Sequence, residues 1–234
     1  MGLSSVVCNG LARGLLGHVL PLRCLACPAL TRGSELGPFL CVRCARELHA
    51  LRGRRWEIDG TRVVAAFRYA GAARVLIREL KFRGATALAS PLGGALGVAL
   101  SELPPGPIGI VPIPLHWRRR WHRGHNQSVA LARAVAASRP GFGLLAALRK
   151  SRATPPQVGL DGSQRRRNVR GTFAVPRRYA ASVRGARLVV VDDVATTAAT
   201  LLSARDCLAA AGAAEVTLAA AAVATDKQRT VVIL

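Results

Sequence analysis

The sequence predicts an α/β protein in which a parallel or mixed sheet is flanked by helices and preceded by a small metal-binding module. Strand-like and helix-like segments alternate over most of the chain after residue 55, which is the pattern of a sheet covered by helices. The segment RLVVV (187–191) is apolar without alternation, as expected of a strand that is buried on both faces. Two Cys-x-x-Cys pairs lie near the N-terminus and indicate a separate metal site.

Length and charge bound the class of protein. A chain of 234 residues, of which 50% are hydrophobic, is long enough to bury one main core and carry an appended module. Its 34 Lys and Arg against 12 Asp and Glu give a net charge of +22, and residues 104–190 hold seventeen basic residues but a single acidic one, Asp161. This balance favours an anionic partner, whether a nucleic acid, a membrane surface or a polyphosphate ligand.

No segment is predicted to cross a membrane. The longest apolar run, near the C-terminus, is interrupted by Glu215 and is rich in alanine, which does not favour insertion. Residues 1–20 lack a charged start and a clean apolar middle, so they predict a short amphipathic helix rather than a secretory signal. We therefore expect a cytoplasmic protein, in which structural disulfides between its six cysteines are disfavoured.

The metal-binding module is predicted from the spacing of four cysteines, Cys24, Cys27, Cys41 and Cys44. Thirteen residues separate the two pairs, and each pair can present two thiolates to one tetrahedral Zn²⁺. The alternative is a redox or disulfide role, which needs no second pair at this spacing. We expect a structural zinc site in a module spanning residues 1–55, with the main domain at 56–234. Five nearby arginines indicate either a nucleic-acid contact or a solvated basic face; they are Arg43, Arg46, Arg52, Arg54 and Arg55.

The elements of the first half of the main domain follow from residue type and spacing. Residues 61–69 are β-branched and aromatic and predict a strand, whereas residues 72–82 carry apolar side chains at helical spacing. A second helix is expected over 85–100. The PPGP segment (104–107) then breaks the chain, and a short buried strand is expected at 108–114.

The second half continues the alternation. Residues 128–138 predict an amphipathic helix, and 149–170 form a basic stretch without regular periodicity. We expect strands at 171–175, 187–191 and 215–224, and a helix over 200–212 that Gly212 closes.

A pair of acids, Asp192 and Asp193, follows the 187–191 strand, at the sheet edge where open α/β folds bind ligands. The segment from Ala195 to Thr200 then leads into a helix, so its amides and hydroxyls can hold an anion, and its small side chains admit a phosphate. Two acids beside an anion site fit sugar hydroxyls and a hydrated Mg²⁺, which together predict a ribose 5-phosphate ligand. The alternative is an acidic strand end that caps the helix.

VVVDDVATTAAT (189–200) resembles the phosphoribosyl pyrophosphate (PRPP) signature of type I phosphoribosyltransferases. Together with the cysteine pairs, LKFRG (80–84), VPIPLHWRRRWHRGHNQ (111–127), TPPQVGL (154–160) and RRRNVRGTF (165–173), it makes nearly the whole chain resemble the ComF family of competence-related proteins. The chain is similar, more distantly, to glutamine PRPP amidotransferases without their glutaminase half. The resemblance implies a type I phosphoribosyltransferase-like sheet of about five strands behind an N-terminal zinc ribbon.

The resemblance also implies roles for individual residues. Asp192 and Asp193 would hold the ribose hydroxyls and, through the ligand or water, Mg²⁺, and a catalytic loop over 152–170 would bring Arg152 and Arg167 over the diphosphate. The implied PRPP-binding positions are Lys81, Pro112, Ile113, Pro114, Arg123, Val194, Ala195, Thr196, Thr197, Ala198, Ala199 and Thr200. The chain departs from the family at Ala198, where Gly is usual, and Ala costs on the order of 1 kcal/mol if that position needs a positive φ.

Two functions follow from the resemblance. The first is a Mg²⁺-dependent phosphoribosyltransferase, a glycosyltransferase of nucleotide metabolism linked to DNA uptake, which transfers or senses the phosphoribosyl group of PRPP. The alternative is a non-catalytic accessory protein of the competence machinery that binds single-stranded DNA through its zinc ribbon and Arg-rich face. The sequence does not identify the acceptor of the group.

Overall fold

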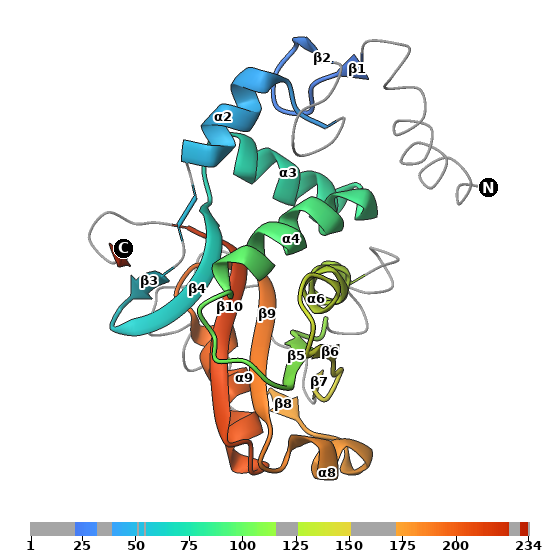
Figure 1. The fold of residues 1–234 in the computed structure, drawn as a ribbon, viewed down its shortest axis with the longest axis vertical. Coiled ribbons are helices and arrows are strands. Elements are labelled where there is room, and N and C mark those ends of the chain that lie inside the picture. The colour runs from blue at the N-terminus through green and yellow to red at the C-terminus, as the bar shows by residue number, and fades with distance from the viewer. Residues whose placement is uncertain are drawn as a thin grey trace, which may run out of the picture.

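In the computed structural model, the fold is built around a seven-stranded sheet in the order β11-β3-β4-β10-β9-β5-β6 (Figure 1). The structure describes residues 22–31, 39–50, 52–53, 55–115, 126–150, 172–224 and 230–233. The predicted helix over 1–20 and three predicted site residues, Arg123, Arg152 and Arg167, lie outside these ranges.

Five strands of the sheet are parallel, from β4 through β10, β9 and β5 to β6, and this part matches the number of strands that the family resemblance implies. Two antiparallel strands, β3 and β11, extend the sheet beyond β4 and were not predicted. The strands are β3 (Arg55–Ile58), β4 (Thr61–Arg68), β5 (Ile108–Pro112), β6 (Phe142–Leu144), β9 (Arg187–Ala195), β10 (Glu215–Val223) and β11 (Thr230–Ile233).

Helices cover both faces of the sheet because its central strands are apolar on both sides. Along β9, Val189 and Val191 join the core under α3, α4 and α6. Leu188 and Val190 join the core under α9 on the opposite face. The helices are α3 (Gly71–Phe82), α4 (Ala89–Ala99), α6 (Gln127–Ala137), the short α8 (Ala180–Val183) and α9 (Ala199–Ala210), with 3₁₀ turns η1 (Thr86–Leu88) and η2 (Arg177–Tyr179).

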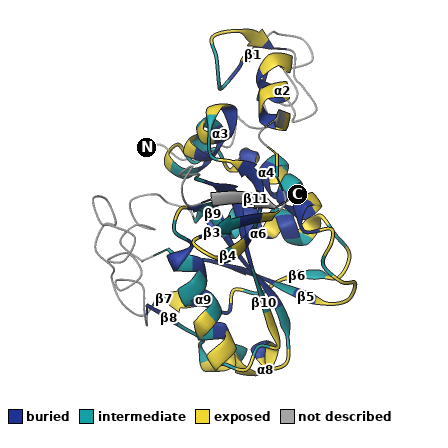
Figure 2. Cartoon of the chain, turned by 90° about the vertical axis from the view of Figure 1, so that its left-hand side faces the viewer, coloured by how far each residue is buried: buried dark blue, intermediate teal, exposed yellow. Residues whose placement is uncertain are grey.

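The cysteine module, formed by β1 (Leu22–Arg23), β2 (Leu30–Thr31) and α2 (Val42–Ala50), is joined to the main domain by a shared core. Cys44 and Leu48 are buried in one cluster with Ala73 and Leu76 of α3, and Figure 2 shows buried segments where α2 approaches α3. The described residues of the module therefore share the core of the main domain.

Two predicted elements are corrected by the structure. The strand predicted at 171–175 is only β8 (Phe173–Ala174), which pairs with β7 (Arg149–Lys150) in a separate two-stranded sheet. Strand β9 does not end before the acid pair but continues to Ala195, because β10 stays paired with it as far as Ala195. Its other neighbour, β5, pairs only up to Val191, so the acids lie beyond the end of β5.

The helix predicted over 200–212 is confirmed as α9, and Gly212 follows it with a φ of +92°, as a C-terminal glycine should. Within the described ranges, no helix is long and apolar enough to cross a membrane.

Candidate functional site

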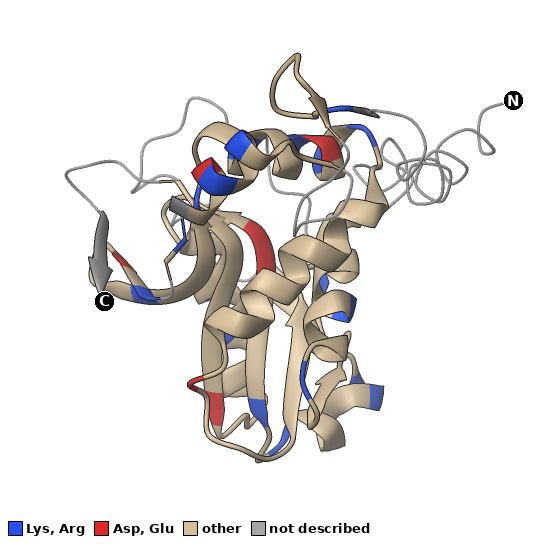
Figure 3. Cartoon of the chain, turned by 45° about the horizontal axis from the view of Figure 1, so that its top comes forward, with Lys and Arg blue, Asp and Glu red and all other residues tan. Residues whose placement is uncertain are grey.

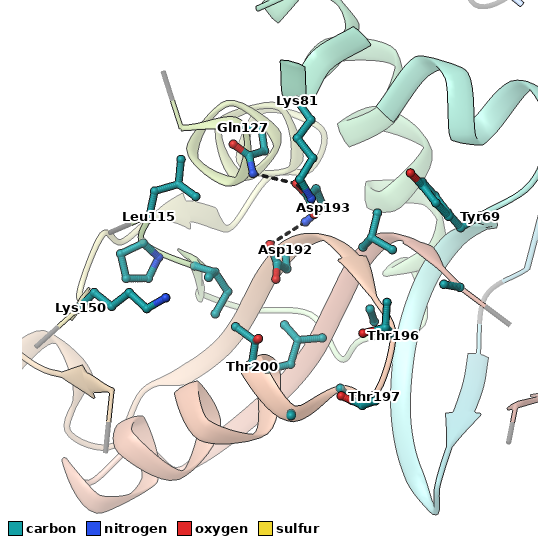
Figure 4. A pocket seen from close by; sticks show the side chains of 18 residues that line it. Tyr69, Lys81, Leu115, Gln127, Lys150, Asp192, Asp193, Thr196, Thr197 and Thr200 are labelled. Atoms are coloured by element: carbon teal, nitrogen blue, oxygen red, sulfur yellow. Dashed lines mark hydrogen bonds and ion pairs between the residues drawn. The ribbon is translucent and has the colours of Figure 1, made fainter. Parts of the chain in front are cut away.

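A pocket of about 350 Å³ opens at the carboxyl edge of the parallel strands and contains the acid pair (Figure 4). Its walls come from the ends of β4, β5, β9 and β10, from the first residues of α6 and α9, from α3 and from β7. The lining residues are Tyr69, Lys81, Ile113, Pro114, Leu115, Gln127, Lys150, Asp192, Asp193, Val194, Ala195, Thr196, Thr197, Ala198, Ala199, Thr200, Leu201 and Ala224.

The two carboxylate oxygens of Asp192 differ in their hydrogen bonds. Its Oδ1 accepts from Ser128 Oγ at 3.0 Å and from the Asp193 amide at 2.8 Å, whereas its Oδ2 accepts no hydrogen bond from the residues that the structure describes. Although the side chain retains partial exposure, burial by the surrounding protein and the adjacent Asp193 carboxylate raise the pKa of Asp192 to about 7. A metal ion or a hydroxyl donor would favour the ionised form.

Asp193, in contrast, is buried, and both of its carboxylate oxygens contact side chains of the protein. Lys81 Nζ lies 3.0 Å from both of its carboxylate oxygens, and Gln127 Nε2 donates to Oδ2 at 2.8 Å. Consecutive residues of a strand point to opposite faces, and Figure 4 shows Asp193 directed towards Lys81 and Gln127 while Asp192 lies at the pocket floor. The sequence alone does not distinguish the two acids, but in the structure they have different surroundings.

The segment after β9 forms one wall of the pocket, at the amino end of α9. Ala198 precedes α9 in the left-handed conformation, with a φ of 52°, and its carbonyl accepts the first helical bond from Leu202. Ala198, the N-cap residue, has no side chain that could cap the helix, and a helix amino end of this kind can present its first amides to an anion. Three hydroxyl side chains surround the same turn; they belong to Thr196, Thr197 and Thr200.

The amino end of α6 lies on the other side of the acid pair from the α9 turn. Asn126 caps α6 by accepting from the Ser128 amide at 3.0 Å, and its Nδ2 donates to the Ile113 carbonyl at 3.2 Å. The turn after β5 is thereby fixed to the positive end of the α6 dipole. Lys150, at the end of β7, extends its side chain into this part of the pocket.

The structure brings together most of the predicted site. Lys81, Ile113, Pro114 and the whole 194–200 segment line one pocket with the acids. Pro112 is the last residue of β5 and is not among the lining residues. Sequence reasoning missed Tyr69, Gln127, Ser128 and Lys150. For Gln127 and Ser128, the sequence offered one clue: Asn126 is a preferred N-cap residue, so the two residues after it could have been placed at the start of a helix.

The four cysteines form one cluster, as predicted. Their sulfur atoms all lie within 4.8 Å of one another, and Cys27 Sγ is 3.7 Å from Cys41 Sγ. A backbone hydrogen bond from Cys44 lowers the pKa of the Cys41 thiol to about 7, whereas burial raises that of Cys44. Four sulfur donors at this spacing could hold a metal ion and fit a zinc ribbon.

Comparison with known proteins agrees with this architecture. Residues 127–233 match the model of the phosphoribosyl transferase domain family. The chain is 32% identical over 204 residues to the DNA utilization protein YhgH of Escherichia coli O157:H7, covering 81% of this chain and 86% of the relative. It is 26% identical over 178 residues to Competence protein F of Haemophilus influenzae, covering 69% of this chain and 74% of the relative.

Among solved structures, the chain is similar to the glutamine PRPP amidotransferase of B. subtilis complexed with ADP and GMP, with 20% identity and a TM-score of 0.41. That match covers 62% of this chain but only 30% of the amidotransferase. The identity to YhgH over most of both chains and the match to the phosphoribosyl transferase domain show that this chain belongs to the family of YhgH and Competence protein F, the ComF family.

Proposed function

We propose that the protein binds PRPP with Mg²⁺ in the cytoplasm and transfers its phosphoribosyl group to an acceptor. The observation that carries the proposal is the position of Asp192. Its carboxylate lies in one pocket between two helix amino ends, those of α9 and α6. A pentose with phosphate groups at both ends, and hydroxyls between them, has the complementary distribution of charge and hydrogen-bond donors.

The 5-phosphate is proposed to bind at the α9 turn. The amides of the first helical turn and the hydroxyls of Thr196, Thr197 and Thr200 supply donors, and the small side chains around Ala198 allow the phosphate to approach the backbone. This assignment uses every residue of the predicted 194–200 segment except Val194 as either a donor or a small wall residue.

The pyrophosphate is proposed to bind at the α6 side. There the Ile113–Leu115 turn, the positive end of α6 and the ammonium of Lys150 face the pocket. Arg123, Arg152 and Arg167, which lie outside the described residues, remain proposed as additional cations over the same group.

The acid pair is proposed to act unequally on the sugar. Asp192, whose Oδ2 accepts no hydrogen bond from a described residue, would accept from a ribose hydroxyl and from water on Mg²⁺. Asp193 would instead hold Lys81 and Gln127 in place, through the contacts already described. Bound Mg²⁺ would supply charge neutralisation of the pyrophosphate, so that cleavage of the C1–O bond needs little acid or base chemistry from the protein.

The proposal is tested by thermal unfolding and by a pyrophosphate-release assay. PRPP with Mg²⁺ is expected to raise the melting temperature, and Asp192→Asn is expected to remove this effect. Asp206→Asn is the matched control, because Asp206 is exposed, lies outside the pocket and, among the described residues, pairs with its neighbour Arg205. Pyrophosphate release is then measured with purines, pyrimidines and ammonia as acceptors. A melting temperature that PRPP does not change in the wild-type protein would reject the proposal.

We also propose that the cysteine cluster holds one structural Zn²⁺ and that the chain divides into a module at 1–55 and a phosphoribosyltransferase-like domain at 56–234. The donor set supports zinc, since four thiolates suit a closed tetrahedral site. Because α2 shares its core with α3, the proposed module would fold as part of the domain rather than beside it.

A second candidate function is binding of single-stranded DNA as a non-catalytic partner of the competence machinery. The names of the relatives associate them with DNA utilization and competence, and Arg23, Arg43 and Arg46 are exposed on the module. Figure 3 shows basic residues on several elements and few acidic ones. If this face binds DNA, the affinity for an oligonucleotide should fall steeply as the salt concentration rises. The double variant Arg43→Ala, Arg46→Ala should bind more weakly and show a smaller dependence on salt. Oligonucleotide binding that changes neither with the salt concentration nor in the double variant would exclude DNA binding by this face.

A further inference from the structure

We infer that a cleft between β4 and β10 is a docking site for a short, extended, acidic segment of another protein. The cleft has a volume of about 690 Å³ and is lined by the first residues of both strands, together with residues of β3 and α9. It shares no described residue with the pocket that contains the acid pair. That pocket lies at the carboxyl ends of the parallel strands, whereas the β4–β10 cleft lies at their amino ends.

The cleft exists because the two strands begin before they pair with each other. β4 begins at Thr61 and β10 at Glu215, but their pairing starts only at Val64 and Ala219. The residues before these points stay extended because each strand pairs with its outer neighbour, β4 with β3 and β10 with β9. Figure 1 shows the β3–β4 hairpin curving away from β10 in this region. Each strand therefore turns one main-chain edge towards the cleft without a partner from the other strand.

These main-chain edges indicate what kind of molecule the cleft accepts. The amide and carbonyl groups of an unpaired strand edge are a template for a second extended chain, which can add to the sheet by main-chain hydrogen bonds. Residues 61–63 offer roughly 10 Å of edge, at about 3.3 Å per residue. The cleft closes where Val64 meets Ala219, so a short extended segment fits and a long strand does not.

Three arginines on two sides of the cleft set the charge of the segment. Arg62 lies on the same face of β4 as Val64, because side chains alternate along a strand, and Arg55 is the partner of Val64 on β3. Arg205 comes from α9, which packs against the opposite face of the sheet. A peptide strand in the cleft directs successive side chains to these two faces, so two consecutive acidic residues would meet both groups of arginines.

The arginines are available to a carboxylate from a partner. Arg62 is exposed and makes no ion pair with any residue that the structure describes. Arg55 pairs with Glu102 and Arg205 pairs with Asp206, but both pairs are exposed, and exposed pairs are replaced at little cost. A guanidinium group binds a carboxylate through two parallel hydrogen bonds. The cleft therefore selects an acidic segment over a neutral or basic one.

The one acidic lining residue and the apolar floor are consistent with this selection. Glu215 lies 3.7 Å from Arg187, which offsets its charge. Val63 and Leu218 are buried at the floor of the cleft, so apolar, β-branched side chains beside the acids would complete the contact.

The occupant is not a second copy of this chain, because the chain does not contain such a segment. It has only 12 acidic residues among 234, and the single place where two of them are adjacent is Asp192–Asp193. These two residues lie in the middle of the sheet, on β9. The acidic segment must therefore come from a different protein.

The test uses the full chain and the fluorescein-labelled peptide Thr-Val-Glu-Glu-Val-Thr, with binding followed by fluorescence polarisation at about 0.15 M salt. A peptide with Lys-Lys in place of Glu-Glu reverses the charge, and one with N-methyl groups on both valines lacks two main-chain donors. Each should bind about tenfold more weakly or worse. Arg62→Glu should weaken binding of the acidic peptide by about fivefold or more. Arg78→Glu, at an exposed position of α3 outside both pockets, is the matched control and should stay within about twofold of the wild type.

Hydrogen exchange separates strand pairing from simple attraction to a chain with a net charge of +22. Bound peptide should slow the exchange of amides at 61–63 or at 215–218, because main-chain hydrogen bonds protect them. Equal binding of the N-methylated peptide, or no protection of either edge, would overturn the inference. Displacement of the peptide by a single-stranded oligonucleotide whose own binding is lost in Arg62→Glu would assign the cleft to nucleic acid, and would overturn it too. PRPP binding with Mg²⁺ should be unchanged in Arg62→Glu, so the inference and the proposed function fail independently.

Discussion

Lys81 and Asp193 form a partly buried ion pair that joins α3 to the acid pair on β9. The ammonium nitrogen lies 3.0 Å from the carboxylate, whose side chain is only 5% exposed, and the two residues are 112 positions apart in the sequence. Because α3 also shares its core with the cysteine module, this contact links the module, the helix and the pocket.

The first prediction concerns the cost of breaking this pair. Lys81→Met leaves the buried Asp193 carboxylate with Gln127 as its one side-chain donor among the described residues, so we expect a loss of about 1.5–3 kcal/mol in the free energy of unfolding. Adding Asp193→Asn removes the buried charge and should recover most of that loss. Denaturant unfolding measures both.

The control for this prediction is the exposed pair between Arg83 and Glu79 on the same helix, in which Arg83 is 77% exposed. Arg83→Ala is expected to change stability by less than about 0.5 kcal/mol, since exposed pairs contribute little. A double variant as unstable as Lys81→Met alone would show that Lys81 stabilises α3 through packing and not through charge.

The second prediction follows from the raised pKa of Asp192. Its value of about 7 in the folded state, against the ordinary 3.8, means that the folded protein binds an extra proton between these pH values. Stability should therefore fall as the pH rises from about 4 to 7 and level off above 7. Asp192→Asn should reduce this fall and stabilise the ligand-free protein at pH 8 by about 2–4 kcal/mol.

Ligand binding should show the opposite pH dependence. Mg²⁺ with PRPP needs the ionised carboxylate, so its affinity should rise through pH 7 in the wild-type protein. A stability profile that is the same in wild type and Asp192→Asn would contradict the assigned environment of this group.

Much of the fold was predictable because its central elements are long and apolar. Strands β4, β9 and β10 and helices α3, α6 and α9 follow from local residue patterns. The edge strands do not: β3 and β11 are each four residues long, and they pair residues 55–58 with 230–233. Such pairing depends on distant parts of the chain, which a local pattern does not encode.

The site was predictable where it is continuous in sequence. The 192–200 segment carries acids, hydroxyls and small residues in one run, so its position and general chemistry could be read directly. The unequal surroundings of Asp192 and Asp193 could not, because they come from Lys81, Gln127 and Ser128 on other elements. Tyr69 looked like an ordinary strand residue, and only the strand order places it in the pocket.

The third prediction concerns Ala198, where the positive φ considered from the sequence is confirmed at 52°. Relief of the left-handed strain would favour Gly by about 1–2 kcal/mol. Ala198 is only 3% exposed, however, so Gly also loses a buried methyl group worth about 0.8 kcal/mol and gains flexibility in the unfolded chain. Ala198→Gly should therefore change the unfolding free energy by less than about 1 kcal/mol.

A β-branched residue has no such compensation at this position. Ala198→Val adds bulk to a buried left-handed turn, so we expect a loss of more than about 2 kcal/mol, with weaker PRPP binding because the methyl groups occupy the approach to the α9 amides. If Ala198→Val has the same free energy of unfolding and the same PRPP affinity as Ala198→Gly, the backbone of this turn is not constrained.

The last prediction concerns the cysteine cluster. The purified chain should contain about one zinc ion, and Cys44→Ser should lose it, because a closed structural site needs all four ligands. Cys44 is buried in the same cluster as Leu48, Ala73 and Leu76, so loss of the metal should lower the melting temperature of the whole chain and not only of the module. Elemental analysis and thermal unfolding measure these effects, and Cys207→Ser, a cysteine outside the cluster, is the matched control. The metal should also be lost at low pH, where protons compete for the thiolates. Zinc content unchanged in Cys44→Ser, or equal loss in Cys207→Ser, would contradict a four-cysteine site.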